Sequence, residues 1–200
     1  MKLYYHPLST YSQKTLIALY EKGASFEREI IDLTSAEKRA EFKKFYPLGK
    51  VPVLVDGDKF IPESSIIIEY LEGAIAGGTR LIPEDRETAR KVRFHDRTND
   101  LYLDEPAVNV LFERDVAKAK ETLDVTYRFL DKHLDKRSWL VGETFTMADC
   151  AAAPALGYLR QVYPFATFSN VDAYWNRIAE RTSVRRALDE AKPYLHHVIK

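Results

Sequence analysis

The first part of the chain alternates between short apolar runs and stretches with helical spacing of apolar residues. This alternation predicts strands at residues 2–6, 26–31, 51–55 and 59–61, and helices at residues 9–22, at 35–45 and from residue 63. The Asp56-Gly57 dipeptide between two apolar runs is typical of a tight hairpin. The predicted order is therefore β-α-β-α-β-β-α, ending at the glycine pair Gly77-Gly78.

After Pro83 the strand signals disappear and helical spacing takes over. Residues 86–116 have the pattern of a long helix, and Pro106 should kink or end it. A second helix is indicated by apolar residues at spacings of three and four, namely Val116, Ala119, Leu123, Tyr127, Leu130 and Leu134.

Two further helices are indicated near the C-terminus. Thr146-Met-Ala-Asp149 is a capping-box pattern that opens a helix, and another apolar stripe covers residues 171–179. The change in pattern near residue 80 predicts two domains, an α/β domain at residues 1–77 and an all-helical domain at residues 86–200.

Composition and charge narrow the classes of function. The 200 residues are 46% hydrophobic and 30% charged, which suits a globular protein with a core. Thirty basic residues balance thirty acidic ones, so we expect no attraction to nucleic acid or to anionic membranes. No apolar run approaches the length of a membrane span, and the N-terminus lacks the apolar segment of a secretory signal.

Cysteine and histidine usage bears on redox and metal chemistry. Cys150 is the only cysteine, which excludes a disulfide within the chain, a Cys-x-x-Cys motif and a cysteine-rich metal site. The histidines do not have metal-ligand spacing, so we expect no metal. A reducing, cytoplasmic compartment is the simplest location.

The most informative stretch is residues 46–64. It contains a tight turn, a Val51-Pro52 step into a strand, a hairpin, and a helix start at Glu63-Ser64. Free N–H groups and the positive end of the helix dipole favour a carboxylate at such a start. The segment is therefore suited to hold a small anionic peptide, although an edge-strand proline and a plain helix cap would show the same residues.

Three separated motifs give the chain a family resemblance. Pro47-Leu-Gly-Lys-Val-Pro-Val-Leu54, Glu63-Ser64 and Val141-Gly-Glu-Thr-Phe-Thr-Met-Ala-Asp149 occur in an order similar to that of the cytosolic glutathione S-transferases. The chain resembles the serine-type members, of the zeta- and theta-like bacterial kind. The resemblance implies a thioredoxin-like N-terminal domain, an all-helical C-terminal domain, and a homodimer.

The same resemblance implies a glutathione site. In the family a residue equivalent to Val51 pairs its main chain with the cysteinyl backbone of glutathione, and the bond to the next proline is cis. Glu63 and Ser64 would take the γ-glutamyl end, with the acidic residue receiving the ammonium. Lys50 would add a main-chain or ammonium contact. Lys38 or Arg39 could meet the glycyl carboxylate, although their helix is so charged that a solvated face is the simpler interpretation.

The chemistry needs a group that acts on the sulfur of glutathione. A thiol with pKa ~8.5 is only about 3% thiolate at pH 7, and lowering that pKa by about two units takes roughly 2.7 kcal/mol. One hydrogen bond to a charged group contributes roughly 1.5–3 kcal/mol, so a single hydroxyl suffices without a metal.

The turn after the first strand supplies several hydroxyls. By resemblance Ser9 is the first candidate for the active serine and Ser12 the second, with Tyr5, Thr10 and Tyr11 behind them. Tyr11 stands where cysteine-type relatives have their cysteine, which disfavours thiol-transfer chemistry.

The acceptor pocket should lie between the domains. The expected lining is Leu8, Tyr11, His95, Asn99, Tyr102 and Leu103. The resemblance implies a transferase whose glutathione thiolate attacks a small, mostly apolar electrophile. A glutathione-dependent isomerase, dehalogenase or peroxidase would use the same activated sulfur. A non-catalytic glutathione-binding or regulatory protein of the same fold is the alternative from another class.

Overall fold

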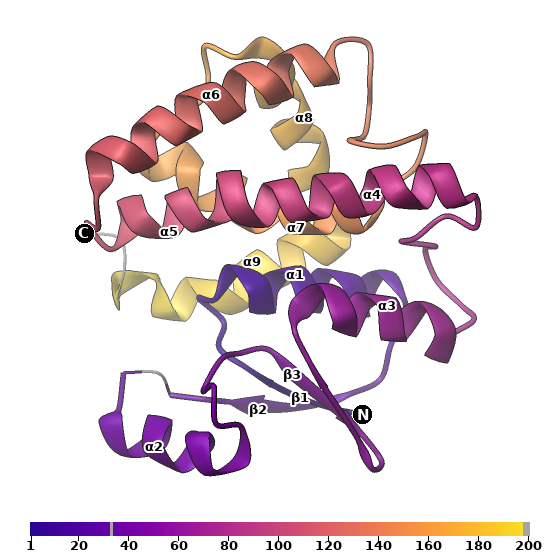
Figure 1. The fold of residues 1–200 in the computed structure, drawn as a ribbon, viewed down its shortest axis with the longest axis vertical. Coiled ribbons are helices and arrows are strands. Elements are labelled where there is room, and N and C mark those ends of the chain that lie inside the picture. The colour runs from indigo at the N-terminus through magenta and orange to yellow at the C-terminus, as the bar shows by residue number, and fades with distance from the viewer. Residues whose placement is uncertain (33, 198–200) are drawn as a thin grey trace.

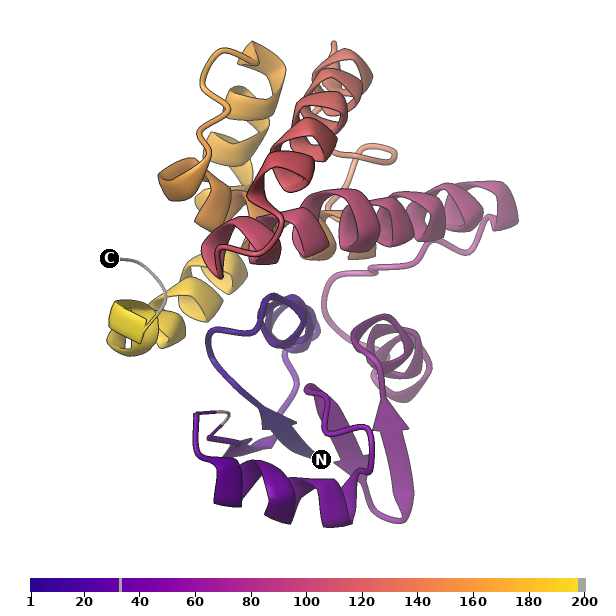
Figure 2. The same cartoon turned by 60° about the vertical axis from the view of Figure 1, so that its left-hand side comes forward.

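The N-terminal part of the chain is a four-stranded sheet between two layers of helix. The computed structural model describes residues 1–32 and 34–197. The elements are β1 (Lys2–Tyr5), α1 (Thr10–Glu21), β2 (Glu27–Ile30), α2 (Ala36–Phe45), β3 (Val53–Asp56), β4 (Lys59–Pro62) and α3 (Ser64–Ala74). Helices α1 and α3 cover one face of the sheet and α2 lies on the other (Figure 1 and Figure 2). The predicted β-α-β-α-β-β-α order and thioredoxin-like arrangement are confirmed.

The sheet has the order β2-β1-β3-β4. Strand β2 pairs parallel to β1, whereas β3 pairs antiparallel to both β1 and β4. Leu3 and Tyr5 of β1 are buried, while the ring of Tyr4 lies 4.7 Å from that of Phe45 on α2. The side chains of successive β1 residues thus point to opposite faces of the sheet, as expected for a strand.

The strand predicted at residues 51–55 begins two residues later than expected. Pairing starts at Val53, which faces Tyr4 on one side and Pro62 on the other. The reason is Pro52, which has no N–H to give to the ladder. The Val51 main chain therefore lies ahead of the sheet.

The C-terminal part consists of helices. They are α4 (Arg86–Asn99), the π-helical segment η1 (Asp100–Asp104), α5 (Glu105–Leu111), α6 (Val116–Leu134), α7 (Met147–Val162), α8 (Ser169–Ala179), α9 (Thr182–Ala191) and the 3-10 helix η2 (Lys192–His197). The predicted all-helical domain is confirmed. The domain boundaries at residues 77 and 86 stay a prediction, with α3 ending at Ala74 and α4 beginning at Arg86.

Pro106 does not end the long helix as expected. It lies in the first turn of α5, directly after the π-helical segment η1. The π-helical turn changes the hydrogen-bond register just ahead of Pro106, which lets the helix continue past a residue that has no N–H to donate. The helix ends instead at Leu111, followed by Glu113 and Asp115 with positive φ angles of 54° and 43°.

Helix α9 was not predicted, and it joins the two domains. It packs along α1 (Figure 1), where the Arg181 guanidinium donates two hydrogen bonds, of 2.9 and 2.6 Å, to the Glu21 carboxylate. Its buried positions are Ser183, Val184, Ala187 and Ala191, and Val184, Ala187 and Ala191 lie at helical spacing, so the sequence does carry a short apolar stripe here.

The capping box at the start of α7 is confirmed. The buried Asp149 carboxylate accepts hydrogen bonds from Thr146 N at 2.8 Å and Thr146 Oγ1 at 3.0 Å. It also accepts from Leu140 N at 3.1 Å and from the Tyr174 hydroxyl at 2.7 Å. Asp149 thus fixes the start of α7 relative to α8.

We expect Thr146→Val to lower the free energy of unfolding by about 1–2 kcal/mol, because a buried carboxylate loses one donor of its cap. Urea unfolding checks this. Thr122→Val is the control, since Thr122 bonds only a carbonyl of its own exposed helix turn, and we expect a change within about 0.5 kcal/mol. Equal effects at both positions would contradict a special role for the box.

Candidate active site

Ser9 lies in the turn between β1 and α1 and is the N-cap of α1. Its Oγ accepts a hydrogen bond from Ser12 N at 3.3 Å. Its own N–H donates to His6 O at 3.0 Å, which closes the turn. The side chain is partly exposed. Because the cap uses Ser9 Oγ only as an acceptor, its hydroxyl proton stays available for a bound anion.

The other hydroxyls of this turn are committed to structural contacts. Ser12 is fully buried, and its Oγ accepts from His6 N at 3.3 Å. Thr10 is 4% exposed, and its Oγ1 donates to Asp104 Oδ2 at 2.9 Å. The structure thus places the second candidate, Ser12, inside the turn and not at its surface.

The two tyrosines are also engaged. Tyr5 is 2% exposed and donates its hydroxyl proton to Glu190 Oε2 at 3.2 Å. Burial, and then the charge of Glu190, raise the Tyr5 pKa. Burial, and then the charges of Asp104 and Asp100, raise the pKa of the half-buried Tyr11. Neither phenol forms a phenolate readily, and Tyr5 lies in the interface with α9.

The segment predicted to hold glutathione has the expected backbone. The Val51–Pro52 peptide bond is cis. Val51 is partly exposed, Pro52 is buried and Lys50 is exposed. An extended peptide can therefore reach the Val51 main chain ahead of β3.

Glu63 and Ser64 form the start of α3. Ser64 is 4% exposed, whereas the Glu63 side chain is exposed and makes no cap hydrogen bond. Glu63 has φ 71°, a value that costs a residue with a side chain about 1–3 kcal/mol and that collects at functional sites. The strained turn thus places an exposed carboxylate at the N-terminus of α3.

A buried ionic cluster lies behind this helix start. The Lys14 ammonium contacts Asp96 Oδ1 at 2.7 Å, both oxygens of Asp100 at 2.9 Å and Ser65 Oγ at 2.9 Å. Ser65 Oγ in turn donates to Asp96 Oδ2 at 2.6 Å. Burial alone would lower the Lys14 pKa, but Asp96 and Asp100 outweigh it and raise the pKa. The cluster joins α1, α3, α4 and η1 and was not predicted.

Helical register determines where the residues expected to line the acceptor pocket lie. Asp96, Asp100 and Asp104 recur every four residues and face α1. The neighbouring positions 95, 99 and 103 were expected to line the pocket. One residue along a helix turns the side chain by about 100°, which directs these three into the helical domain.

The contacts of these residues agree with this register. The His95 ring lies 4.3 Å from that of His133, Asn99 Nδ2 donates to Ala148 O at 3.0 Å, and Leu103 is fully buried. Tyr102 is 51% exposed on the outside of the same helical stretch. Of the expected lining, the half-buried Leu8 and Tyr11 belong to α1 and the turn before it.

His95 should make stability depend on pH. Burial, and then the nearby charges of His133 and Arg137, lower its pKa from 6.5 to about 4. Between these values the unfolded chain binds a proton that the folded chain does not, so stability is complete above pH 6.5 and falls toward pH 4. We expect a loss of up to about 3 kcal/mol over this window.

Denaturant unfolding of the protein and of His95→Phe at a series of pH values isolates this effect. The variant should lose less stability over the window, because other groups titrate equally in both proteins. Parallel stability curves would show that His95 takes up its proton as readily in the folded chain.

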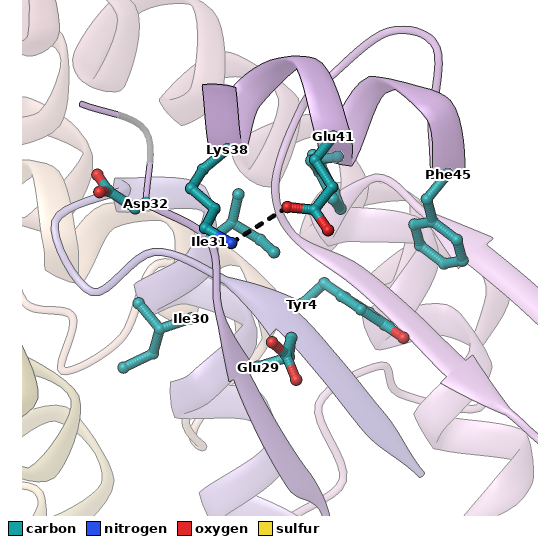
Figure 3. A pocket seen from close by; sticks show the side chains of 9 residues that line it. Tyr4, Glu29, Ile30, Ile31, Asp32, Lys38, Glu41 and Phe45 are labelled. Atoms are coloured by element: carbon teal, nitrogen blue, oxygen red, sulfur yellow. Dashed lines mark hydrogen bonds and ion pairs between the residues drawn. The ribbon is translucent and has the colours of Figure 1, made fainter. Parts of the chain in front are cut away.

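Lys38 lies at a separate hollow between α2 and the edge strand β2. The hollow has a volume of about 430 Å³, and its lining is Tyr4, Glu29, Ile30, Ile31, Asp32, Lys38, Glu41, Phe42 and Phe45 (Figure 3). The Lys38 ammonium contacts Glu41 at 3.2 Å in this hollow. Ser9 and Ser64 do not line this hollow, so Lys38 lies in a different part of the surface from these two residues.

The described residues form neither a candidate metal site nor a candidate membrane-spanning helix. Over residues 1–32 and 34–197, His, Cys, Asp and Glu do not gather in groups of three that could hold a metal ion. In the same ranges we find no helix whose length and apolar character would let it span a membrane.

The chain is similar to known transferases over most of its length. Residues 3–78 match the family model of the glutathione S-transferase N-terminal domain, and residues 111–182 match that of the C-terminal domain. Glutathione S-transferase 3 of Zea mays is 31% identical, with 94% of this chain and 93% of the relative covered. Glutathione S-transferase F10 of Arabidopsis thaliana is 30% identical, with 90% and 92% covered.

Solved structures agree in fold. Glutathione transferase F2 of Populus trichocarpa has a TM-score of 0.87 at 22% identity and covers 96% of this chain and 99% of its own. Glutathione S-transferase III in its apo form has a TM-score of 0.80 at 30% identity, with 94% and 95% covered. The likeness includes both the α/β part and the helical part.

Proposed function

This chain belongs to the glutathione S-transferase family and is a glutathione transferase, and we propose that Ser9 is the group that activates the thiol of its co-substrate. The observation that carries the proposal is the state of the Ser9 hydroxyl. It is partly exposed and has a proton to donate, whereas Ser12, Thr10 and Tyr5 are buried in structural contacts. The chain is accordingly assigned to the serine type.

Glutathione is held by backbone and by a helix start in this proposal. The Val51 main chain pairs with the cysteinyl residue, and Lys50 lies beside it. The N–H groups of α3 and the Ser64 hydroxyl bind the γ-glutamyl carboxylate, because the positive end of the helix dipole favours an anion. The exposed Glu63 carboxylate receives the γ-glutamyl ammonium. Lys38 would need to leave Glu41 to meet the glycyl carboxylate.

The reaction then needs one hydrogen bond at the sulfur. The thiol gives its proton to solvent, and the Ser9 hydroxyl donates to the thiolate that remains. The sulfur attacks an electrophilic carbon, and its electron pair forms the new carbon–sulfur bond. In a substitution the bond from that carbon to the leaving group breaks and the leaving group departs as an anion, whereas in an addition the π electron pair moves to the neighbouring atom, which takes a proton from solvent. A small, mostly apolar electrophile would approach past Leu8 and Tyr11. Conjugation is the proposed reaction, in preference to isomerisation, dehalogenation or peroxide reduction.

A homodimer is the proposed assembly. Large apolar side chains are exposed on the neighbouring helices α3, α4 and α6 and on η1, namely Ile66, Phe94, Tyr102, Val125 and Phe129. The Glu69–Arg93 ion pair ties α3 to α4 within this face. Light scattering at micromolar concentration should give twice the chain mass, and Phe94→Glu should reduce it to one chain. A cytoplasmic location remains a prediction.

Retention on immobilised glutathione tests the binding site. We expect the protein to be retained and to elute with free glutathione. Ser64→Ala should weaken glutathione binding by about tenfold, since a hydrogen bond to a carboxylate is lost. Ser183→Ala is a matched control, because this buried serine bonds Glu21 far from the site. Equal retention of Ser64→Ala and the unaltered protein would contradict the proposed site.

A further inference from the structure

The turn that carries Ser9 is held from the helical domain by a set of hydrogen bonds. Gln13 Nε2 donates to Pro7 O at 2.8 Å and to the Tyr158 hydroxyl oxygen at 2.9 Å. The Tyr158 hydroxyl donates its own proton to Leu8 O at 3.1 Å. We refer to these contacts of Gln13 and Tyr158 as the Gln13–Tyr158 bridge. It holds the carbonyls of both residues that lie between His6 and Ser9.

The bridge is rigid because its side chains are buried. Gln13 is fully buried and Tyr158 is 4% exposed. Burial raises the pKa of Tyr158 to about 12, so its hydroxyl remains a donor at neutral pH. The start of α7, the helix that carries Tyr158, is fixed by the Asp149 cap. The position of the Tyr158 hydroxyl is therefore determined by the helical domain.

We propose that Tyr158 is a positioning residue for thiol activation, which fixes the place of the Ser9 hydroxyl through the Gln13–Tyr158 bridge. The inference rests on the proposed role of Ser9. Ser9 Oγ is only two bonds from its Cα, so its position follows the backbone of the turn. A hydrogen bond weakens steeply when its angle or length departs from the optimum, so a small shift of the turn weakens the contact to sulfur.

The bridge makes chemistry in one domain depend on contact with the other. Ser9 and Gln13 belong to the α/β domain, whereas Tyr158 is separated from Gln13 by 145 positions in the sequence. Its hydroxyl accepts from one side chain of the turn region and donates to one of its carbonyls. Thiol activation thus requires that the two domains are docked.

Tyr158→Phe tests the proposal because it removes the hydroxyl and keeps the ring. We expect kcat to fall about 3- to 10-fold, the effect of one neutral hydrogen bond. The pKa of the bound glutathione thiol should rise by about half a unit to one unit. KM for glutathione should stay within about twofold, because the bridge does not touch Val51, Glu63 or Ser64.

Tyr127→Phe is the matched control. Tyr127 is a buried tyrosine of the same domain whose hydroxyl donates to a backbone carbonyl, Tyr163 O, at 2.9 Å. It should lose a similar amount of thermal stability and leave kcat and the bound thiol pKa unchanged. An equal kcat loss in both variants would reduce Tyr158 to a general stability role and overturn the proposal.

A double-mutant cycle with Ser9→Ala separates the inference from the proposed function. In the Ser9→Ala background, Tyr158→Phe should not raise the thiol pKa further, since no hydroxyl remains to position. Additive effects would overturn the inference. If Ser9→Ala alone raises the thiol pKa and Tyr158→Phe does not, only the inference fails. If Ser9→Ala leaves the thiol pKa unchanged, the role of Ser9 fails, and the inference fails with it.

Discussion

Ser9→Ala should lower kcat for conjugation by about 10- to 150-fold with little change in KM for glutathione. The range follows from the roughly 1.5–3 kcal/mol that a hydrogen bond to a charged group supplies. The effect should fall on kcat because the bond forms with the thiolate, while Val51, Glu63 and Ser64 hold the remainder of glutathione. Initial rates with a chromogenic electrophile, at varied glutathione, measure both constants.

The control must separate the lost hydroxyl from the lost helix cap. Ser35 is the N-cap of α2, and its Oγ accepts from Lys38 N at 3.2 Å, much as Ser9 Oγ accepts from Ser12 N at 3.3 Å. Ser35→Ala therefore removes a similar cap without removing the proposed donor. We expect its kcat to stay within about twofold. An equally active Ser9→Ala would contradict the role of the Ser9 hydroxyl.

Lys14→Met should lower the free energy of unfolding by about 3–5 kcal/mol, because it leaves Asp96 and Asp100 buried without their cation. Guanidinium unfolding at pH 7 measures the change. Lys14→Met combined with Asp96→Asn and Asp100→Asn should recover part of the loss, since the uncompensated charges are then removed.

Lys38→Met provides the comparison for this effect. Lys38 and Glu41 form an exposed pair three residues apart, and such pairs contribute little. We expect a change of at most about 0.5 kcal/mol. If Lys14→Met were no more harmful than Lys38→Met, the buried cluster would not stabilise the contact between α1, α3 and α4.

Much of the fold could be predicted because its signals are local. Strand length, the Asp56-Gly57 hairpin and the capping box at Thr146 and Asp149 all act within a few residues. Helix α9 was missed although Val184, Ala187 and Ala191 lie at helical spacing, because two of these three buried residues are alanines and the stripe is short. Of the two effects expected of Pro106, a kink or an end, the end does not occur, because a π-helical turn before it lets the helix continue.

Some parts of the candidate site could likewise be predicted from local sequence motifs, and others could not. Ser9, Val51 and the Glu63-Ser64 helix start belong to short motifs and could be proposed from the sequence. The Lys14 cluster could not, because Asp96 and Asp100 on a highly charged helix have the pattern of a solvated face. Only the contact between α1 and α4 makes them a buried pair. The same contact places His95, Asn99 and Leu103 in the helical domain, one helical position from the residues that face α1.

The Gln13–Tyr158 bridge was beyond the sequence for a further reason. Its members are 145 positions apart, and each has an ordinary environment in its own helix. From the sequence, Gln13 has the pattern of an ordinary polar residue in a helix, and Tyr158 has that of a core residue of α7. Their proposed role depends on their hydrogen bonds to the carbonyls of Pro7 and Leu8, the two residues before Ser9.

The pH titration of bound glutathione tests the central claim most directly. The thiolate is followed by its ultraviolet absorbance in the complex, for the unaltered protein and for Ser9→Ala. We expect an apparent pKa about two units below the ~8.5 of a free thiol in the unaltered protein, and a return most of the way toward that value in Ser9→Ala. Identical titration curves for the two proteins would contradict the assignment of Ser9 as the group that stabilises the thiolate.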